Sequence, residues 1–130
     1  EENYQTARKE ALEGFQMVPM DKRVEKHTAL LGKTFRGEWS ITLYRGTLDG
    51  VPAVIESMWC PSNPLLPLSR GKRKTYHFVP KDVAKAWTAE WAEKKGVTAD
   101  MAEKWLKRHP GDPRAEIYEE VLKGVASSPS

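Results

Sequence analysis

The sequence contains one cysteine, Cys60, three histidines and no run of 18 apolar residues. A single cysteine excludes an internal disulfide and the small secreted scaffolds that need several, so we expect an intracellular protein, its compartment unspecified. Without a long apolar run we expect no membrane-spanning helix and no membrane partner. The histidines and the cysteine lack paired ligand spacing, so we expect neither a metal nor a cofactor.

Recognisable catalytic motifs are also missing. The chain has no glycine-rich phosphate-binding motif, no HExxH and no GxSxG. Cys60 and His77 could meet as a thiol–imidazole dyad if their strands are neighbours, but no orienting acid is encoded near them. We therefore predict a protein that is not an enzyme and has no catalytic residue.

What the chain does contain is the composition of a globular domain. Its 130 residues are 39% apolar and 30% charged, with five tryptophans and a net charge of +3. These proportions lie far from those of disordered chains, and the length fits one hydrophobic core. We expect one domain over residues 1–126 and a frayed tail over 127–130.

Hydrophobic spacing predicts helices at both ends of the chain and strands between them. Apolar residues three and four apart predict a helix over 4–15, and Asp21 and Gly32 delimit a second, shorter one. A period of two predicts strands over 38–48, 51–59 and 74–79. Capping residues after Pro80 predict three helices, over 82–95, from Thr98 to His109, and from Asp112 to Gly124. This order indicates an α+β fold, an antiparallel sheet of about four strands within 33–80 packed by N-terminal and C-terminal helices.

Asp49-Gly50 between two strand patterns predicts a tight hairpin, because a type I′ turn needs positive φ at both positions. The resulting register pairs Leu48 with Val51, Tyr44 with Ile55, Leu43 with Glu56 and Ile41 with Met58. Glu56 then falls on the apolar face. Either it is a buried carboxylate paired with Arg45 or Arg36, or a bulge shifts the register; the bulge is the interpretation we favour.

Residues 60–68, CPSNPLLPL, hold three prolines and therefore predict a loop, neither a helix nor a central strand. Three leucines, Leu65, Leu66 and Leu68, are unusual in a solvated loop. We expect this loop to lie across the core, with a neighbouring chain as the alternative.

The basic charge is concentrated in the predicted sheet. Residues 33–80 hold seven Lys or Arg against three acids, whereas 81–130 hold nine of each. Cations beside aromatic rings suit the phosphates and bases of unpaired nucleic acid. We expect the C-terminal helices to pack on one side of the sheet and to leave the other side as a basic face. We predict a nucleic-acid-binding module, RNA or single strands favoured, that uses this face and the 70–74 cluster, with these contact residues: Arg36, Arg45, Arg70, Lys72, Arg73, Lys74, Tyr44 and Tyr76. A solvated charged loop beside a core strand is the structural alternative.

The tryptophans suggest a second function. Trp87, Trp91 and Trp105 have the spacing of core residues on their predicted helices. An exposed one would anchor an interface, because Trp is enriched at such sites. The alternative hypothesis is therefore an adaptor or subunit with a protein partner, or a homo-oligomer.

Overall fold

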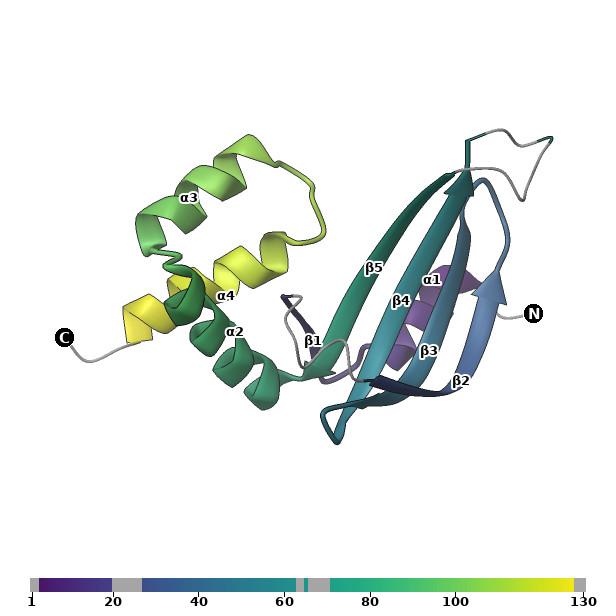
Figure 1. Ribbon diagram of the computed structural model, residues 1–130, viewed down its shortest axis with the longest axis horizontal. Coiled ribbons are helices and arrows are strands. Elements are labelled where there is room, and N and C mark those ends of the chain that lie inside the picture. Colours follow the sequence, from purple (N-terminus) through teal and green to yellow (C-terminus); the bar gives the residue numbers. More distant parts are fainter. Residues whose placement is uncertain (1–2, 20–26, 63–64, 66–70, 128–130) are drawn as a thin grey trace.

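The computed structural model describes residues 3–19, 27–62, 65 and 71–127 (Figure 1). Its elements are α1 (Tyr4–Ala11), β1 (Phe15–Val18), β2 (His27–Phe35), β3 (Ser40–Leu48), β4 (Val51–Pro61), β5 (Gly71–Pro80), α2 (Lys81–Lys95), α3 (Ala99–Arg108) and α4 (Ala115–Ser127). The strands form one five-stranded antiparallel sheet in the order β1-β5-β4-β3-β2. The predicted α+β class is confirmed. None of the helices within the described ranges is long and apolar enough to cross a membrane.

Two N-terminal predictions are wrong because strand pairing overrides the local helix pattern. The first helix ends at Ala11, and Gly14 turns the chain with a φ of 78° so that Phe15–Val18 pairs with the end of β5. The predicted second helix is contradicted from His27 onward, where β2 pairs along β3; residues 20–26 lie outside the described ranges. A few apolar residues fit the period of a helix as well as that of a strand. The neighbouring strand with which they pair therefore determines the secondary structure.

The hairpin prediction is confirmed. Asp49 and Gly50 have φ values of 51° and 79°, and the four predicted cross-strand pairs are present. The expected bulge at Glu56 is wrong: β3 and β4 pair without a shift, and the Glu56 side chain is buried. The irregularity lies instead between Ala29 and Leu31, where β2 meets β3.

Helices cover both faces of the sheet. The α1 face carries Leu43, Val54, Glu56 and Phe78; Ala11 of α1 packs against its apolar side chains, as does Ile117 of α4. On the opposite face, Ala84 of α2 packs against Leu48, Ile55 and Val79. The three C-terminal helices stand beside the β1–β5 edge (Figure 1), because β5 runs directly into α2. They do not lie on one face as we expected.

Carboxylates on α4 fasten it to β1. Glu116 and Glu120 are one helical turn apart; the first accepts a hydrogen bond from the Met17 backbone N–H at 3.1 Å, the second from the Gln16 side-chain amide at 2.8 Å. The outer backbone N–H groups of an edge strand have no partner within the sheet. Glu116 therefore satisfies one such group of β1, and Glu120 adds a side-chain contact.

The C-terminal helices follow their predicted caps. Gly96 ends α2 in a left-handed conformation, and the Thr98 hydroxyl accepts the Met101 N–H at the start of α3. Asp112 Oδ1 accepts the Arg114 N–H at 2.9 Å, and α4 begins at Ala115. The expected stop at Gly124 is wrong, since α4 continues to Ser127.

The proline-rich segment starts later than predicted. Cys60 and Pro61 complete β4, a central strand, opposite Lys72 and Gly71; Pro61 is tolerated as the last strand residue, where the ladder ends. Leu65 is 87% exposed and does not cover the core. Leu66 and Leu68 lie outside the described residues.

Candidate nucleic-acid interface

Lys72, Arg73 and Lys74 form the beginning of β5, and we call them the β5 cations. They lie within the strand, whereas the sequence placed them partly in a loop. Arg70 lies outside the described residues. Because β1 pairs only with residues 77–80 of β5, no strand in the described part of the chain pairs with the outer edge of 71–76. The cations therefore line an open sheet edge.

The two-residue period of a strand divides these cations between the two faces. Lys74 lies opposite Met58, and Lys72 opposite Cys60, on the α1 face, where Tyr76 also lies opposite Glu56. Arg73 lies opposite Trp59 on the other face. The single basic sheet face that we expected is not formed. What the structure contains is a basic edge, with side chains reaching from both sides.

Two of the β5 cations lie over tryptophan rings. The Arg73 guanidinium is 5.4 Å from the Trp59 ring centroid and donates to Ser57 Oγ at 2.7 Å. On the α1 side, Lys74 Nζ is 5.4 Å from the ring of Trp39, which directly precedes β3. Both rings are half-buried. Neither tryptophan was among the predicted site residues, although both lie close to the β3–β4 ends that the register of the hairpin brings together.

The absence of a side chain at Gly71 lets the Trp59 ring pack close to the strand. A Cβ at this position would lie 2.8 Å from Trp59 Cη2 and would also collide with the Cys60 carbonyl oxygen. A Cβ at such short distances would force neighbouring atoms to move, and the Cys60 carbonyl belongs to the backbone, which cannot move as easily as a side chain. The glycine that precedes the three cations therefore allows the indole to pack beside them.

The other predicted contact residues are dispersed. Arg36 is exposed in the β2–β3 connection, at the same end of the sheet as the β5 cations. Arg45 lies on the α1 face but pairs with Val54, four residues along β4 from Met58, the partner of Lys74. Tyr44 is half-buried on the opposite face, against the core around Ile55. The structure thus brings Arg36 toward the β5 cations and leaves Arg45 and Tyr44 apart.

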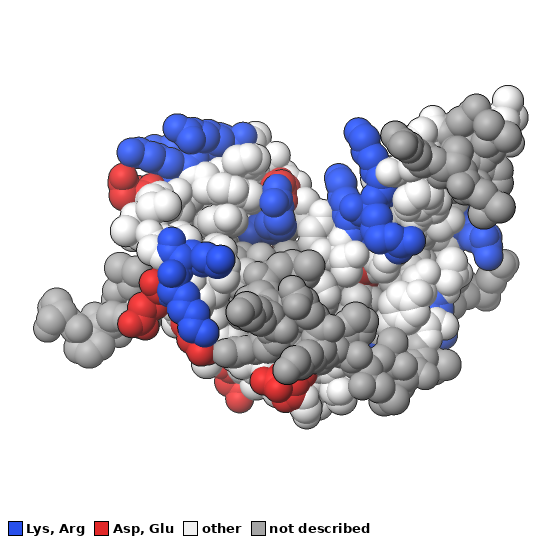
Figure 2. Space-filling view, viewed as in Figure 1, with Lys and Arg blue, Asp and Glu red and all other residues white. Residues whose placement is uncertain are grey.

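The surface is hollowed into a notch between the C-terminal helices and the upper part of β5, and Lys and Arg side chains stand on both sides of it (Figure 2). The α3–α4 connection faces β5 across this notch (Figure 1). Burial is the main cause that raises the pKa of Tyr76 above its ordinary value, and the negative charge of Asp112 adds to it.

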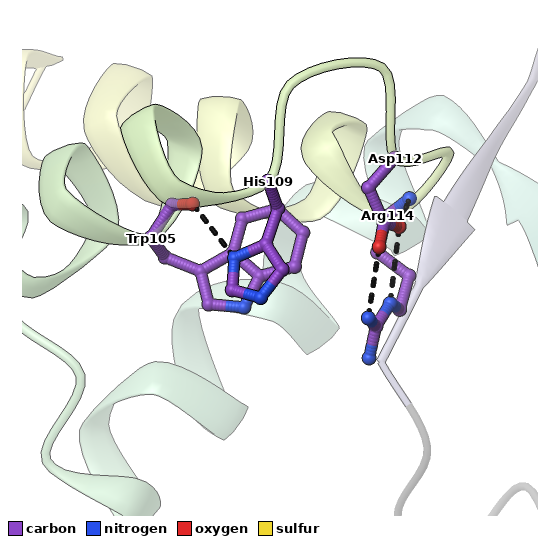
Figure 3. A network of polar contacts seen from close by, with 4 residues as sticks. All are labelled: Trp105, His109, Asp112 and Arg114. Carbon is purple, nitrogen blue, oxygen red and sulfur yellow. Dashed lines mark hydrogen bonds and ion pairs between the residues drawn. The ribbon is translucent and has the colours of Figure 1, made fainter.

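Trp105 of α3 is the centre of an aromatic stack with His109 and with Tyr118 of α4, and Figure 3 shows its ring against that of His109. Its ring is 4.0 Å from the Tyr118 centroid at an interplanar angle of 13°, and 4.3 Å from His109 at 20°. His109 Nδ1 lies 2.9 Å from the Trp105 carbonyl oxygen, which can only accept, so this nitrogen is the donor. Arg114 lies over the same indole, 5.3 Å from its centroid.

Arg114 also binds Asp112 through two side-chain hydrogen bonds, at 3.1 and 2.9 Å (Figure 3). The guanidinium lowers the pKa of Asp112 to about 2. This fixed pair orients Arg114 toward the indole of Trp105. Helical spacing predicted Trp105 as a core residue and gave no prediction for Arg114; an arginine directly after the Asp112-Pro113 cap was the available signal.

Glu56 belongs to a closed polar network beneath α1, apart from the notch. It is 1% exposed, accepts from Arg8 Nε at 2.9 Å and also accepts from the Tyr4 hydroxyl. Burial, followed by the hydrogen bond and charge of Glu56, raises the pKa of Tyr4 well above its usual range. The expected partners, Arg45 and Arg36, are wrong, because α1 brings Arg8 onto this face and supplies the counter-charge.

The hypothetical Cys60–His77 dyad is contradicted by the register. Cys60 pairs with Lys72 on the α1 face, whereas His77 pairs with Ile55 on the opposite face, five residues away along β4. The two side chains cannot exchange a proton directly from these positions.

Comparison with protein-family models, with curated proteins and with solved structures gives no match.

Proposed function

We propose that this chain is a non-enzymatic module that binds single-stranded nucleic acid, RNA in preference to DNA, along the outer edge of β5. The observation that carries the proposal is the pairing of cations with aromatic rings on both sides of one strand end: Arg73 with Trp59, and Lys74 with Trp39. Each pair offers a positive charge for a phosphate beside a ring on which a base can stack.

The geometry favours an unpaired strand over a duplex. The β5 cations follow one extended β-strand. Their spacing therefore suits the sugar-phosphate backbone of one nucleic-acid strand that lies along the sheet edge and enters the notch. Half-buried indoles can stack only with bases that are already unstacked from their neighbours. Lys and Arg side chains on the two sides of the notch then supply positive charge (Figure 2).

Hydroxyl groups beside Arg73 support the preference for RNA. Thr42, Ser57 and Thr75 occupy adjacent positions on three neighbouring strands, on the same face as Trp59. All three are half-buried. A hydroxyl can donate to and accept from the ribose 2′-OH, the group that distinguishes RNA from DNA.

The salt dependence of RNA binding tests the proposal. A short labelled RNA of mixed sequence is titrated with protein at several salt concentrations, and Kd is obtained from fluorescence anisotropy. Each phosphate contact to a single strand contributes about −0.7 to the log–log slope, so K72Q/R73Q/K74Q should flatten the slope by about 2. The fold should persist, because exposed cations contribute little to stability.

A charge-matched variant serves as control. Lys81, Lys85 and Lys95 are exposed on α2, away from the β5 edge, and K81Q/K85Q/K95Q removes the same charge. Its slope should stay within a fraction of a unit of the parent slope. If both triple variants bind RNA as tightly as the parent across the salt range, the proposal is wrong.

Stacking is tested separately at Trp59. Trp59→Ala should weaken RNA binding by about 1–3 kcal/mol per base that stacks on the ring. Trp59→Phe, which keeps an aromatic face, should retain most of the affinity. Equal losses in the two variants would argue against a base on this ring.

The adaptor hypothesis rests on one observation, the 87% exposure of Leu65 at the same end of the molecule. Trp87, Trp91 and Trp105 are all half-buried, so none is a fully exposed anchor. If the chain self-associates through this segment, Leu65→Ser should shift the mass measured by light scattering from oligomer to monomer. An RNA-binding defect in that variant would instead connect Leu65 with the β5 edge.

A further inference from the structure

A cavity of about 350 Å³ lies between α1 and the sheet, on the side away from the notch. Its lining includes Ala7 and Ala11 from the helix and Leu43 and Val54 from the sheet, and all four side chains are buried. The volume is at the lower end of the range for small-molecule pockets. It has room for a compact ligand with an apolar body.

The cavity exists because small residues face it from a helix that is fixed elsewhere. Arg8 binds Glu56 and Tyr4 packs against Phe35 at a ring distance of 5.7 Å, which anchors α1 at its N-terminal end. Ala7 and Ala11 project from the same helix with single methyl groups, too short to fill the space above Leu43. The helix cannot move toward β2 and β3 without losing its ionic anchor.

Charged side chains surround this apolar floor. Lys33 and Arg45 line the cavity from β2 and β3, and Glu10 lines it from α1. Lys33 pairs with Leu43, two residues from Arg45 on the same face, so the two cations are diagonal neighbours. Within the described ranges, Arg45 takes part in no ion pair.

We propose that this cavity binds a small amphipathic carboxylate, a monoanion with a short apolar body. The apolar part lies on Ala7, Ala11, Leu43 and Val54, and the carboxylate binds Arg45 at the rim. Arginine suits this role because its planar fork matches the two carboxylate oxygens. The charge of Glu10 disfavours a dianionic head group such as a phosphate monoester.

The experiment uses octanoate as the probe, below the concentration at which it forms micelles, with 1-octanol and octylammonium as comparison compounds of the same chain length. Binding is followed by the amide chemical shifts of the full chain in ¹H–¹⁵N NMR spectra. Octanoate should shift the amides of Ala7, Ala11, Gly32 and Leu43 in a saturable way, 1-octanol should bind about tenfold more weakly, and octylammonium should leave these amides unchanged.

Variants of opposite effect make the test specific. Arg45→Gln should weaken octanoate binding about tenfold, whereas Glu10→Gln should tighten it roughly twofold to fivefold by removing a like charge. Ala7→Leu should fill the cavity and abolish binding while leaving the rim charges in place. The compound series needs no variant and so remains decisive if Ala7→Leu fails to fold. The proposal is overturned if 1-octanol binds as tightly as octanoate, or if Glu10→Gln weakens binding.

Discussion

The most decisive prediction for the fold concerns the buried carboxylate of Glu56. Arg8 is its only cationic hydrogen-bond partner in the described part of the chain, at 2.9 Å, and the Arg8 side chain is 34% exposed. Removing one member of a fully buried ion pair costs about 3–5 kcal/mol, because the other charge stays buried without compensation. Since water reaches Arg8 and the Tyr4 hydroxyl remains, we expect Arg8→Met to lower the free energy of unfolding by about 2–3 kcal/mol.

The companion substitution should behave differently. Glu56→Gln keeps the shape of the side chain and an acceptor for Tyr4, and it leaves Arg8 able to hydrate, so it should cost about 1 kcal/mol. In the double variant no uncompensated charge is buried. Its loss should therefore be smaller than the sum of the single losses by about 1–2 kcal/mol.

Urea unfolding at neutral pH, followed by tryptophan fluorescence, measures all four proteins. Unchanged m-values would show that the same transition is compared. A loss below about 0.5 kcal/mol in Arg8→Met, or strictly additive losses, would contradict a buried Glu56 carboxylate that depends on Arg8 for its counter-charge.

The same network predicts a dependence on alkaline pH. The folded state raises the pKa of Tyr4 above its ordinary value of 10.0, so its neutral form is favoured in the native protein. The resulting stability is present below pH 10 and is lost as the pH rises above it, when the unfolded chain ionises. Tyr4→Phe should remove this share of the decline measured between about pH 9 and 11, and Tyr76, whose pKa is also raised, should contribute a further share.

Substitutions at three further positions test the other elements. Gly50→Val should lower stability by about 1–3 kcal/mol, because a β-branched residue is strained at the φ of 79° found there; an unchanged melting midpoint would contradict this. Asp112→Ala should cost about 1 kcal/mol, allowing for solvent screening of the pair with Arg114. The Asp112 contribution should be lost as the pH falls from about 4 to 2, because the folded pKa is lowered to about 2, and Asp112→Asn should abolish that dependence. Tyr76→Ala should lower the free energy of unfolding more than it weakens RNA binding, because Tyr76 packs against the core around Phe78.

Local signals predicted the elements whose neighbours are close in the sequence. The β3–β4 register follows from the turn at Asp49-Gly50 and two alternating strands, and the Thr98 cap marks the start of α3 with a single hydroxyl. The side-chain period also placed Tyr76 and Phe78 on one face and His77 on the other, as found. In each case a few adjacent residues contain the required information.

Contacts between distant segments could not be predicted in this way. Nothing near Glu56 identifies Arg8, 48 residues earlier, as its partner. A bulge therefore had a lower expected energy cost than an unpaired acid on an apolar face. The open edge of β5 depends likewise on the short length of β1, which pairs only with residues 77–80. The two-residue period of a strand implies that neighbouring β5 cations lie on opposite faces. The strand was expected to begin at Lys74, however, so Lys72 and Arg73 were assigned to a loop.

The pairing of β1 with β5 also sets an order of assembly. Phe15 pairs with Pro80, 65 positions later (80 − 15), whereas β2 to β5 are joined by short local pairings. Closing a long loop is slower than closing a hairpin, so the four-stranded meander should form before α1 and β1 dock on it. Until then the uncovered α1 face exposes Glu56 to water in its ionised form. The acid that the native protein must neutralise with Arg8 thus acts as a charged gatekeeper, keeping the half-assembled apolar surface from pairing with other chains.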